Sequence, residues 1–159
     1  MKNLIYIFIL STQILMSQIA SIDIKTLNNT IINTSQFDNN DDLIIISFWA
    51  TWCKPCISEL ENIHEVYEDW QEETNVKLIA VSVDNSRSQM KVKPLANAKG
   101  WEYEVYIDSN GEFMRSMGVN IIPHTFVLNK NKEAIYSHVG YNSGDEEELY
   151  YFIETYLKQ

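Results

Sequence analysis

Both cysteines of the chain lie in one short stretch, FWATWCKPC, which runs from Phe48 to Cys56. Only Lys54 and Pro55 separate the two thiols, Cys53 and Cys56. Three kinds of site use such a pair: a structural disulfide, part of a metal centre, or a dithiol that exchanges electrons. A disulfide across so short a loop removes little conformational entropy from the unfolded chain, so a purely structural bridge is a poor explanation of the spacing.

The rest of the sequence offers few further metal ligands. A structural zinc site needs four ligands, and the three histidines, His64, His124 and His138, lack the paired spacing that completes such sites. Copper(I) needs only two or three soft ligands, and Met114 and Met117 could supplement the thiols, although both methionines equally suit helix packing. A copper(I) carrier therefore remains an alternative to a redox enzyme.

The sequence around the thiols favours the redox interpretation. LIIISFW, residues 43–49, has the pattern of a buried strand, and apolar residues at helical spacing follow the pair. The thiol of Cys53 would then face the unpaired N–H groups at a helix N-terminus, which favour a thiolate nucleophile. Cys56 would lie one turn along the same helix, where it could resolve a mixed disulfide. Pro55 suits the first helical turn, and Lys54 adds a nearby positive charge.

Composition places the chain among single-domain globular proteins. It has 159 residues, of which 45% are hydrophobic and 12% aromatic, enough apolar side chains for a buried core. The formal net charge is −10, and the longest basic cluster comprises only Lys91 and Lys93. Because a polyanion would be repelled, nucleic acid is excluded as a partner.

The first twenty residues differ from the rest of the sequence. Lys2 supplies positive charge, and LIYIFIL, residues 4–10, is an uninterrupted apolar run. We interpret residues 1–20 as a signal peptide cleaved near Ala20, and residues 21–159 as one mature domain. An uncleaved membrane anchor is the alternative, although polar residues at 11–13 end the apolar run early. The domain is expected to work in the periplasm or elsewhere outside the cytoplasm, where a disulfide persists.

From Ser21 onward, the pattern predicts strands alternating with helices. The expected elements, in chain order, are a hairpin over 22–32, a strand over 43–49, a helix after the cysteines, a strand over 76–84, a helix-prone segment over 86–99, a strand over 105–108, a short helix ending at 118, a hairpin over 124–140 and a helix over 145–158. Pro94 is expected to break or kink the segment that contains it. Strands joined through helices predict an α/β fold with a central mixed sheet flanked by helices.

Several motifs together match a known pattern. They are FWATWCKPC, the glutamate of ISE (Glu59), VSVD at a strand end, the insert from Ser86 to Trp101, and IPHTFVLN. In these motifs the chain resembles the secreted TlpA/ResA-like thiol-disulfide oxidoreductases of the thioredoxin superfamily, over roughly Ile22 to Lys158. The resemblance implies a thioredoxin fold with an N-terminal β-hairpin extension and a helical insert.

The resemblance also implies roles for single residues. Pro123 is expected to follow a cis peptide bond and to lie against the redox pair, and Ile122 would pair its backbone with an incoming substrate. Trp52 is expected on the contact surface. Thioredoxins carry a buried acid in the strand before the motif, but Ser47 stands at that position here. Proton transfer to the resolving thiol would therefore use water, Glu59 or a residue of the insert.

The expected function is a monomeric disulfide reductase without a further cofactor or metal. It would take electrons from a membrane thiol donor and pass them to oxidised cysteines of client proteins. Clients in this family include apocytochrome c, so the resemblance implies roles in cell redox homeostasis and possible cytochrome c biogenesis. Pro55 before Cys56 is similar to the sequence of reducing family members, whereas Lys54 would stabilise the reduced thiolate and favour oxidation of clients. An oxidase or isomerase therefore stays an alternative. Glu59 is a third residue that could tune the reduction potential. A peroxidase using Cys53 and Thr51 is a weaker alternative beside the copper(I) carrier.

Overall fold

Seven strands form one mixed sheet in the computed structural model, which describes residues 19–38, 40 and 42–159. The strands are β1 (Asp23–Thr26), β2 (Ile31–Asn33), β3 (Ile44–Trp49), β4 (Lys77–Ser82), β5 (Glu104–Ile107), β6 (His124–Leu128) and β7 (Ala134–Val139). Their order across the sheet is β2-β1-β5-β4-β3-β6-β7. β4 pairs in parallel with β3 and β5, whereas the other strand pairs are antiparallel. The predicted mixed sheet is therefore confirmed.

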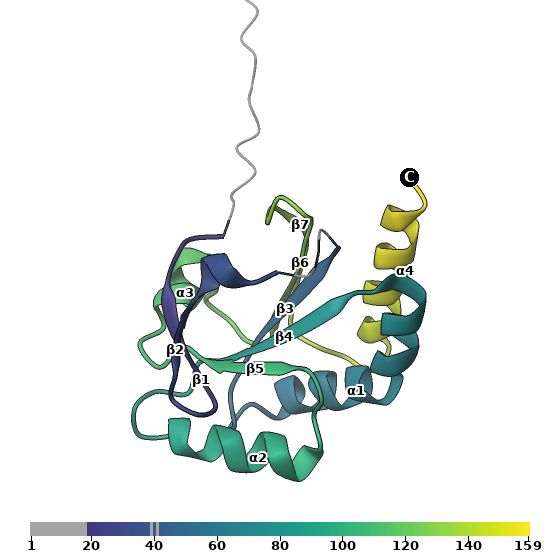
Figure 1. The fold of residues 1–159 in the computed structure, drawn as a ribbon. Helices are drawn as coiled ribbons and strands as arrows, with labels where there is room; N and C mark the ends of the chain where they lie inside the picture. Colours follow the sequence, from purple (N-terminus) through teal and green to yellow (C-terminus); the bar gives the residue numbers. More distant parts are fainter. Residues whose placement is uncertain (1–18, 39, 41) are drawn as a thin grey trace, which may run out of the picture.

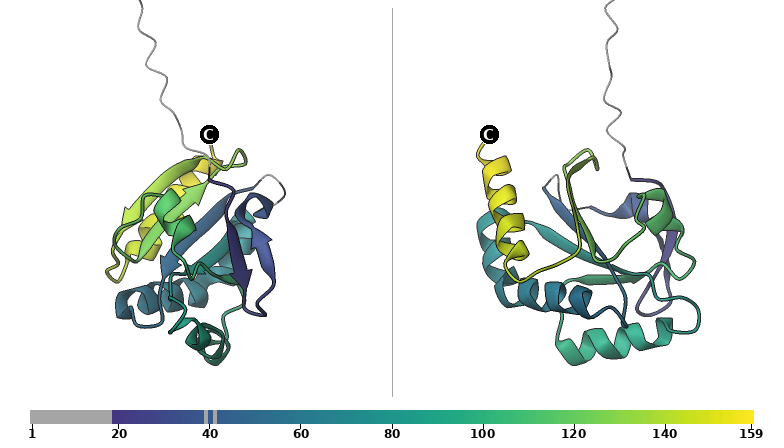
Figure 2. Two further views of the ribbon diagram at one scale, coloured as in Figure 1. Left: turned by 90° about the vertical axis from the view of Figure 1, so that its left-hand side faces the viewer. Right: turned by 180° about the vertical axis from the view of Figure 1, so that it is seen from behind.

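Helices cover both faces of this sheet (Figure 1). They are α1 (Lys54–Thr74), α2 (Val92–Lys99), α3 (Glu112–Ser116) and α4 (Asp145–Leu157), with two short 3-10 helices, η1 (Thr34–Gln36) and η2 (Gln89–Lys91). α1 and α4 pack against each other on one face, whereas α3 and η1 lie on the other, as the two views in Figure 2 show. The result is the predicted α/β sandwich with its N-terminal hairpin and helical insert.

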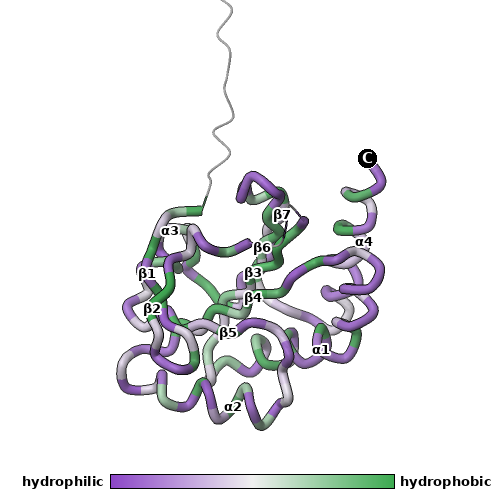
Figure 3. The backbone as a smooth tube through the Cα atoms, viewed as in Figure 1, coloured by the Kyte–Doolittle hydropathy of each residue, from purple (hydrophilic) through white to green (hydrophobic). Residues whose placement is uncertain are grey.

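The core has two parts because successive strand side chains point to opposite faces. On β3, Ile45 and Trp49 are buried with the side chains of α1 and α4. Ile46 and Phe48 point the other way and pack with Phe113 of α3. Hydrophobic residues accordingly gather along the central strands, while hydrophobic and hydrophilic residues alternate along α1 and α2 (Figure 3).

The long helix α1 follows from the periodicity of its apolar residues. Leu60, Ile63, Tyr67 and Trp70 recur at spacings of three and four, and all four are buried against the sheet. The helix ends where Asn75 adopts the left-handed conformation (φ 53°) and its N–H donates to the carbonyl oxygen of Gln71 at 2.8 Å. Because only four residues separate β3 from α1, the helix begins at the carboxyl end of β3.

The helical insert between β4 and β5 corrects one expectation. Pro94 neither breaks nor kinks a helix before Gly100, because α2 begins only at Val92 and continues past the proline to Lys99. Pro94 is the third helical residue, and the missing N–H of a proline is tolerated in the first turn of a helix. The insert therefore consists of η2 followed by an uninterrupted α2.

The predicted signal peptide lies almost entirely outside the described residues, which begin at Ile19. Two residues of the predicted turn cluster at 39–42, Asn39 and Asp41, also lie outside them. In the part of the chain that the structure describes, no helix has the length and apolarity needed to cross a membrane.

Both ends of the described chain lie where β3 begins. The backbone N–H of Ile19 donates to the carbonyl oxygen of Lys132 in the β6–β7 turn at 3.2 Å. Leu157, near the end of α4, lines a pocket together with Leu43, the residue before β3. The two ends therefore lie at the end of the sheet where β3 begins, opposite the start of α1, as Figure 1 shows.

Candidate functional site

The two cysteines form a disulfide at the N-terminal end of α1, with their Cα atoms 5.3 Å apart. Cys53 is the residue before the helix, and its Sγ accepts a hydrogen bond from the backbone N–H of Cys56 at 3.4 Å. Pro55 lies in the first turn, and the first turn contains no acidic side chain. The expected position of the pair at a helix N-terminus is confirmed, and the helix dipole there favours negative charge on sulfur.

The two sulfur-bearing residues differ in accessibility. Cys53 is 6% exposed, whereas Cys56 is completely buried. Lys54, the candidate tuning cation, is exposed to solvent. An incoming thiol or disulfide can therefore approach the pair only from the side of Cys53.

Two tryptophans lie close to the pair in the sequence, one buried and one exposed as the expectation for Trp52 requires. Trp49 is fully buried at the end of β3, and its ring meets that of Trp101 edge to face at 5.0 Å between centroids. Trp52 is 66% exposed immediately before Cys53. One tryptophan therefore anchors the loop, and the other offers a large apolar surface next to the disulfide.

The loop before β6 reaches the same end of the sheet. The peptide bond between Ile122 and Pro123 is cis, as the resemblance implies. Phe48 near the end of β3 pairs in register with His124, so Pro123 lies beside the point where the chain leaves β3 for the cysteines. The carbonyl oxygen of Pro123 accepts a hydrogen bond from the N–H of Gly140 at 2.8 Å, which ties this loop to the end of β7.

A pocket of about 320 Å³ joins the two expected contact residues, Trp52 and Ile122. The rest of its lining comes from the loops after β4 and β5, from α3 and from the loop that also holds Ile122, and comprises Val83, Asn85, Ser109, Asn110, Gly111, Met114 and Asn120. The lining contains no charged side chain, so the pocket suits an uncharged group. Sequence reasoning missed the lining asparagines because they come from separate loops.

Glu59 is buried behind the disulfide. Its side chain is on α1, one turn after Cys56, and the residue is only 4% exposed. The carboxylate accepts hydrogen bonds from the hydroxyls of Ser47 at 2.9 Å and Thr125 at 2.6 Å. Ser47 on β3 and Thr125 on β6 are register partners, so both side chains point to the face that α1 covers.

This arrangement shows what replaces the buried acid of thioredoxins, whose position Ser47 occupies here. The strand position where thioredoxins carry a buried acid holds a hydroxyl here, but α1 brings the carboxyl group of Glu59 to that hydroxyl. Burial raises the pKa of Glu59 from 4.5 to about 7, although the two hydroxyl hydrogen bonds act in the opposite direction. Of the proton carriers that the sequence suggests, Glu59 is therefore a buried carboxyl group one helical turn after Cys56.

A second buried carboxylate holds the loop before Cys53. Asp84, at the carboxyl end of β4, is completely buried. It accepts hydrogen bonds from the N–H of Thr51 at 2.7 Å, from the Thr51 hydroxyl at 2.7 Å and from the Ser82 hydroxyl at 2.9 Å. In the sequence, VSVD is only a motif shared with the family. In the structure, its aspartate, Asp84, holds the backbone of the loop before Cys53.

Replacing Asp84 with asparagine is expected to destabilise the oxidised protein by about 1–3 kcal/mol. An amide nitrogen cannot accept a hydrogen bond, so at least one donor of Thr51 or Ser82 would lose its partner. Urea unfolding of Asp84→Asn measures the effect, with the exposed Asp38→Asn as the matched control. Equal free energies of unfolding for the two variants would contradict the assigned role.

Of the methionines and histidines considered as further ligands, Met114 lines the pocket that contains Trp52 and Ile122. Met114 and Met117 are partly buried and pack against the core beneath α3. The ring of His64 packs against Tyr103 on the α1 side of the sheet, and His124 stacks on Phe126. Within residues 19–38, 40 and 42–159, no group of three or more histidine, cysteine, aspartate or glutamate side chains is arranged to hold a metal ion.

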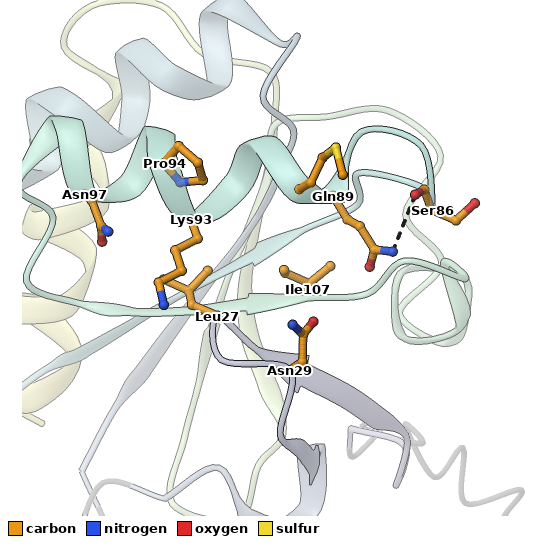
Figure 4. A pocket seen from close by; sticks show the side chains of 9 residues that line it. Leu27, Asn29, Ser86, Gln89, Lys93, Pro94, Asn97 and Ile107 are labelled. Carbon is orange, nitrogen blue, oxygen red and sulfur yellow. Dashed lines mark hydrogen bonds between the residues drawn. The ribbon is translucent and has the colours of Figure 1, made fainter.

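A larger pocket of about 510 Å³ lies away from this site, between the β1–β2 turn and the helical insert (Figure 4). Gln89 and Lys93 of the insert line it opposite Leu27, Asn29 and Ile107. No residue of the candidate site lines this pocket. We therefore place the chemistry at the disulfide rather than at the larger pocket.

Comparisons with known proteins agree with this geometry. The sequence model of the AhpC/TSA family matches residues 16–137. Thiol-disulfide oxidoreductase ResA of Bacillus anthracis is 29% identical over 116 residues, which are 73% of this chain and 62% of the relative. Sporulation thiol-disulfide oxidoreductase A of Bacillus subtilis is 32% identical over 103 residues, 64% of this chain and 62% of the relative. The chain thus spans less than two thirds of the length of these curated relatives.

Solved structures confirm the fold. The solution structure of an uncharacterized thioredoxin-like protein from Porphyromonas gingivalis superposes with a TM-score of 0.79 at 46% identity, over 88% of this chain and 92% of that one. StoA from Bacillus subtilis gives a TM-score of 0.66 at 27% identity, over 84% and 97% of the two chains. With the family match over residues 16–137 and the disulfide at the start of α1, the chain belongs to the AhpC/TSA family of thioredoxin-like proteins.

Proposed function

We propose that this protein is an extracytoplasmic thiol-disulfide oxidoreductase that reduces disulfides in client proteins. The observation that carries the proposal is the Cys53–Cys56 disulfide at the N-terminus of α1, with Cys53 the more accessible member. In the reduced protein, the Cys53 thiolate attacks the client disulfide, and Cys56 then resolves the mixed disulfide. The relatives named as thiol-disulfide oxidoreductases support this chemistry.

The client is held by the surface around the pair. Trp52 and Ile122 line the neutral pocket beside the disulfide, and the hydrogen bond from Gly140 to Pro123 ties the loop of Ile122 to the end of β7. An extended client segment would pair with the backbone of Ile122, which lays its target cysteine over Cys53. Because the pocket has no charged lining, neighbouring client side chains would be apolar or uncharged.

The proposal also includes the direction of electron transfer, the location of the protein and its electron donor. Pro55 before Cys56 resembles reducing relatives, and a membrane thiol donor would return the disulfide to the dithiol state. Residues 1–20 would direct export, either as a cleaved signal peptide or as an uncleaved membrane anchor. Residues 21–159 would work as a monomer. A peroxidase is less favoured. It would use the Thr51 hydroxyl next to Cys53, but this hydroxyl donates its hydrogen bond to Asp84.

The equilibrium reduction potential of the purified protein tests the proposal. A reductase is expected to have a potential of about −250 mV or lower, near that of thioredoxin. The protein is equilibrated in glutathione or dithiothreitol buffers, and the fraction of free thiols is read by alkylation. The Cys56→Ser variant, which cannot form the internal disulfide, is the control for non-specific alkylation.

Other results would contradict the proposal in different ways. A potential of about −120 to −180 mV would indicate an oxidase or isomerase and overturn the assigned direction. The absence of a reversible dithiol couple would overturn the redox function itself. Stoichiometric copper(I) binding that survives competition, found together with that absence, would instead support a copper carrier.

A further inference from the structure

A small cavity separates the carboxyl group of Glu59 from the start of α4. Its volume is about 10 Å³, close to the smallest space that holds one water molecule. Its polar lining consists of Glu59, Thr125, Tyr136, His138, Asp145 and Glu146. The buried carboxyl group therefore has polar neighbours from β6, β7 and α4 around this cavity.

His138 connects this cavity to solvent. On the sheet, His138 of β7 is the register partner of Thr125, whose hydroxyl donates to Glu59. The Nε2 atom of His138 lies 3.2 Å from Oδ2 of Asp145 in the first turn of α4. Their side chains are 32% and 20% exposed, so the pair touches the cavity on one side and solvent on the other.

The other titratable groups around Glu59 are less suited to carry a proton. They come from the segment before β5, from β7, from the loop after it and from α4, and are Tyr103, Tyr136, Tyr141, Asp145 and Glu146. Burial raises the pKa of all three tyrosines, which keeps their protons in place. The Glu146 carboxylate already accepts hydrogen bonds from Tyr141 at 2.6 Å and from the N–H of Gly144 at 3.0 Å.

Imidazole has the chemistry that such a position requires. One ring nitrogen accepts a proton while the other releases one, so a histidine passes protons without changing its place. We propose that His138, oriented by Asp145, carries protons between Glu59 and solvent during disulfide exchange. This inference rests on the proposed function, since it assigns His138 as a proton carrier and Asp145 as its positioning residue in the same reaction.

The reaction balances as follows for a reduced protein and a client disulfide. The Cys53 thiolate attacks one client sulfur, forming a mixed disulfide and releasing the other client sulfur as a thiolate. Cys56 gives its proton to the Glu59 carboxylate and attacks the Cys53 sulfur, which forms the internal disulfide and releases the second client thiolate. The two client thiolates take protons from water, and the Glu59 proton leaves through His138.

The test is a single turnover of the fully reduced protein with glutathione disulfide. Acid quenching and mass spectrometry follow the Cys53–glutathione mixed disulfide, so attack and resolution are measured separately. At low buffer concentration, His138→Gln is expected to slow resolution by about a hundredfold, the lower end of the usual range for loss of an acid–base group, and to leave attack unchanged. Added imidazole should restore the rate, because a diffusing base replaces the missing ring.

Two controls separate proton transfer from a structural effect. His64→Gln changes a histidine on the same helix as the cysteines that does not line the cavity, and it should resolve at the wild-type rate. Adding His138→Gln to Glu59→Gln should cause no further slowing, because both act on one path. A merely structural role would give slowing that imidazole does not rescue.

The outcomes distinguish this inference from the function on which it rests. If the wild-type protein forms and resolves the mixed disulfide but His138→Gln resolves at the same rate, the proton path is wrong and the oxidoreductase stands. Slowing without rescue by imidazole would also overturn the path. If the wild-type protein forms no mixed disulfide with glutathione, the proposed function itself fails.

Discussion

Cys53→Ser will lose disulfide exchange, with a residual rate at the uncatalysed background. The serine hydroxyl is not a nucleophile toward disulfides, and the completely buried Cys56 cannot take over the attack. Reduction of a disulfide-linked test protein, followed by alkylation of its released thiols, measures the loss. We expect a decrease of at least about 1000-fold, as for the removal of an enzyme nucleophile.

Cys56→Ser supplies the matched control and the test of the two roles. This variant keeps the nucleophile at the start of α1, so it should attack a client and remain attached as a mixed disulfide. The trapped species is visible on a non-reducing gel and disappears with dithiothreitol. Trapping by Cys53→Ser instead, with no attack by Cys56→Ser, would reverse the assignment of nucleophile and resolving thiol.

Glu59→Gln will change how the stability of the protein depends on pH. Burial raises the pKa of Glu59 to about 7 in the folded state, from 4.5 in the unfolded chain. Between these values the folded protein holds a proton that the unfolded chain releases, so this stabilising contribution is complete below the unfolded pKa. It is lost as the pH rises through the folded pKa.

The glutamine variant lacks this titration. Relative to the wild type, Glu59→Gln should gain about 2 kcal/mol in free energy of unfolding between about pH 5 and about pH 8. Urea unfolding of both oxidised proteins, followed by tryptophan fluorescence, measures the difference at each pH. Glu65→Gln, an exposed change on the same helix, should show no such dependence. A pH-independent difference for Glu59→Gln would show that the carboxyl group ionises at its ordinary pKa.

The redox pair and its supporting elements were predictable because local patterns determine them. The apolar run of β3 and the helical spacing after Cys56 place the thiols at a helix N-terminus, and the structure confirms both elements. Pro94 was the exception. Its effect depends on where the helix begins, and the polar residues before it gave no sharp start signal.

The position of Glu59 could have been found, whereas the pocket could not. Glu59 falls between Cys56, Leu60 and Ile63 on the same helical stripe, so its spacing already assigned it to the buried face. The sequence analysis accordingly names Glu59 as a possible proton carrier, beside water and a residue of the insert. The pocket beside Trp52 depends on several loops meeting in space, which no local pattern encodes.

The ends of the described chain have a consequence for how the protein meets its partners. Ile19 and Leu157 lie where β3 begins, and the disulfide follows its other end, across a strand that spans roughly 17 Å at the usual rise per residue. If either end were held at a membrane or coupled to a solid support, the dithiol would point outward into the surrounding solution. Attachment at an end would therefore restrict the orientation of the molecule while leaving its reactive face open to collision with large proteins.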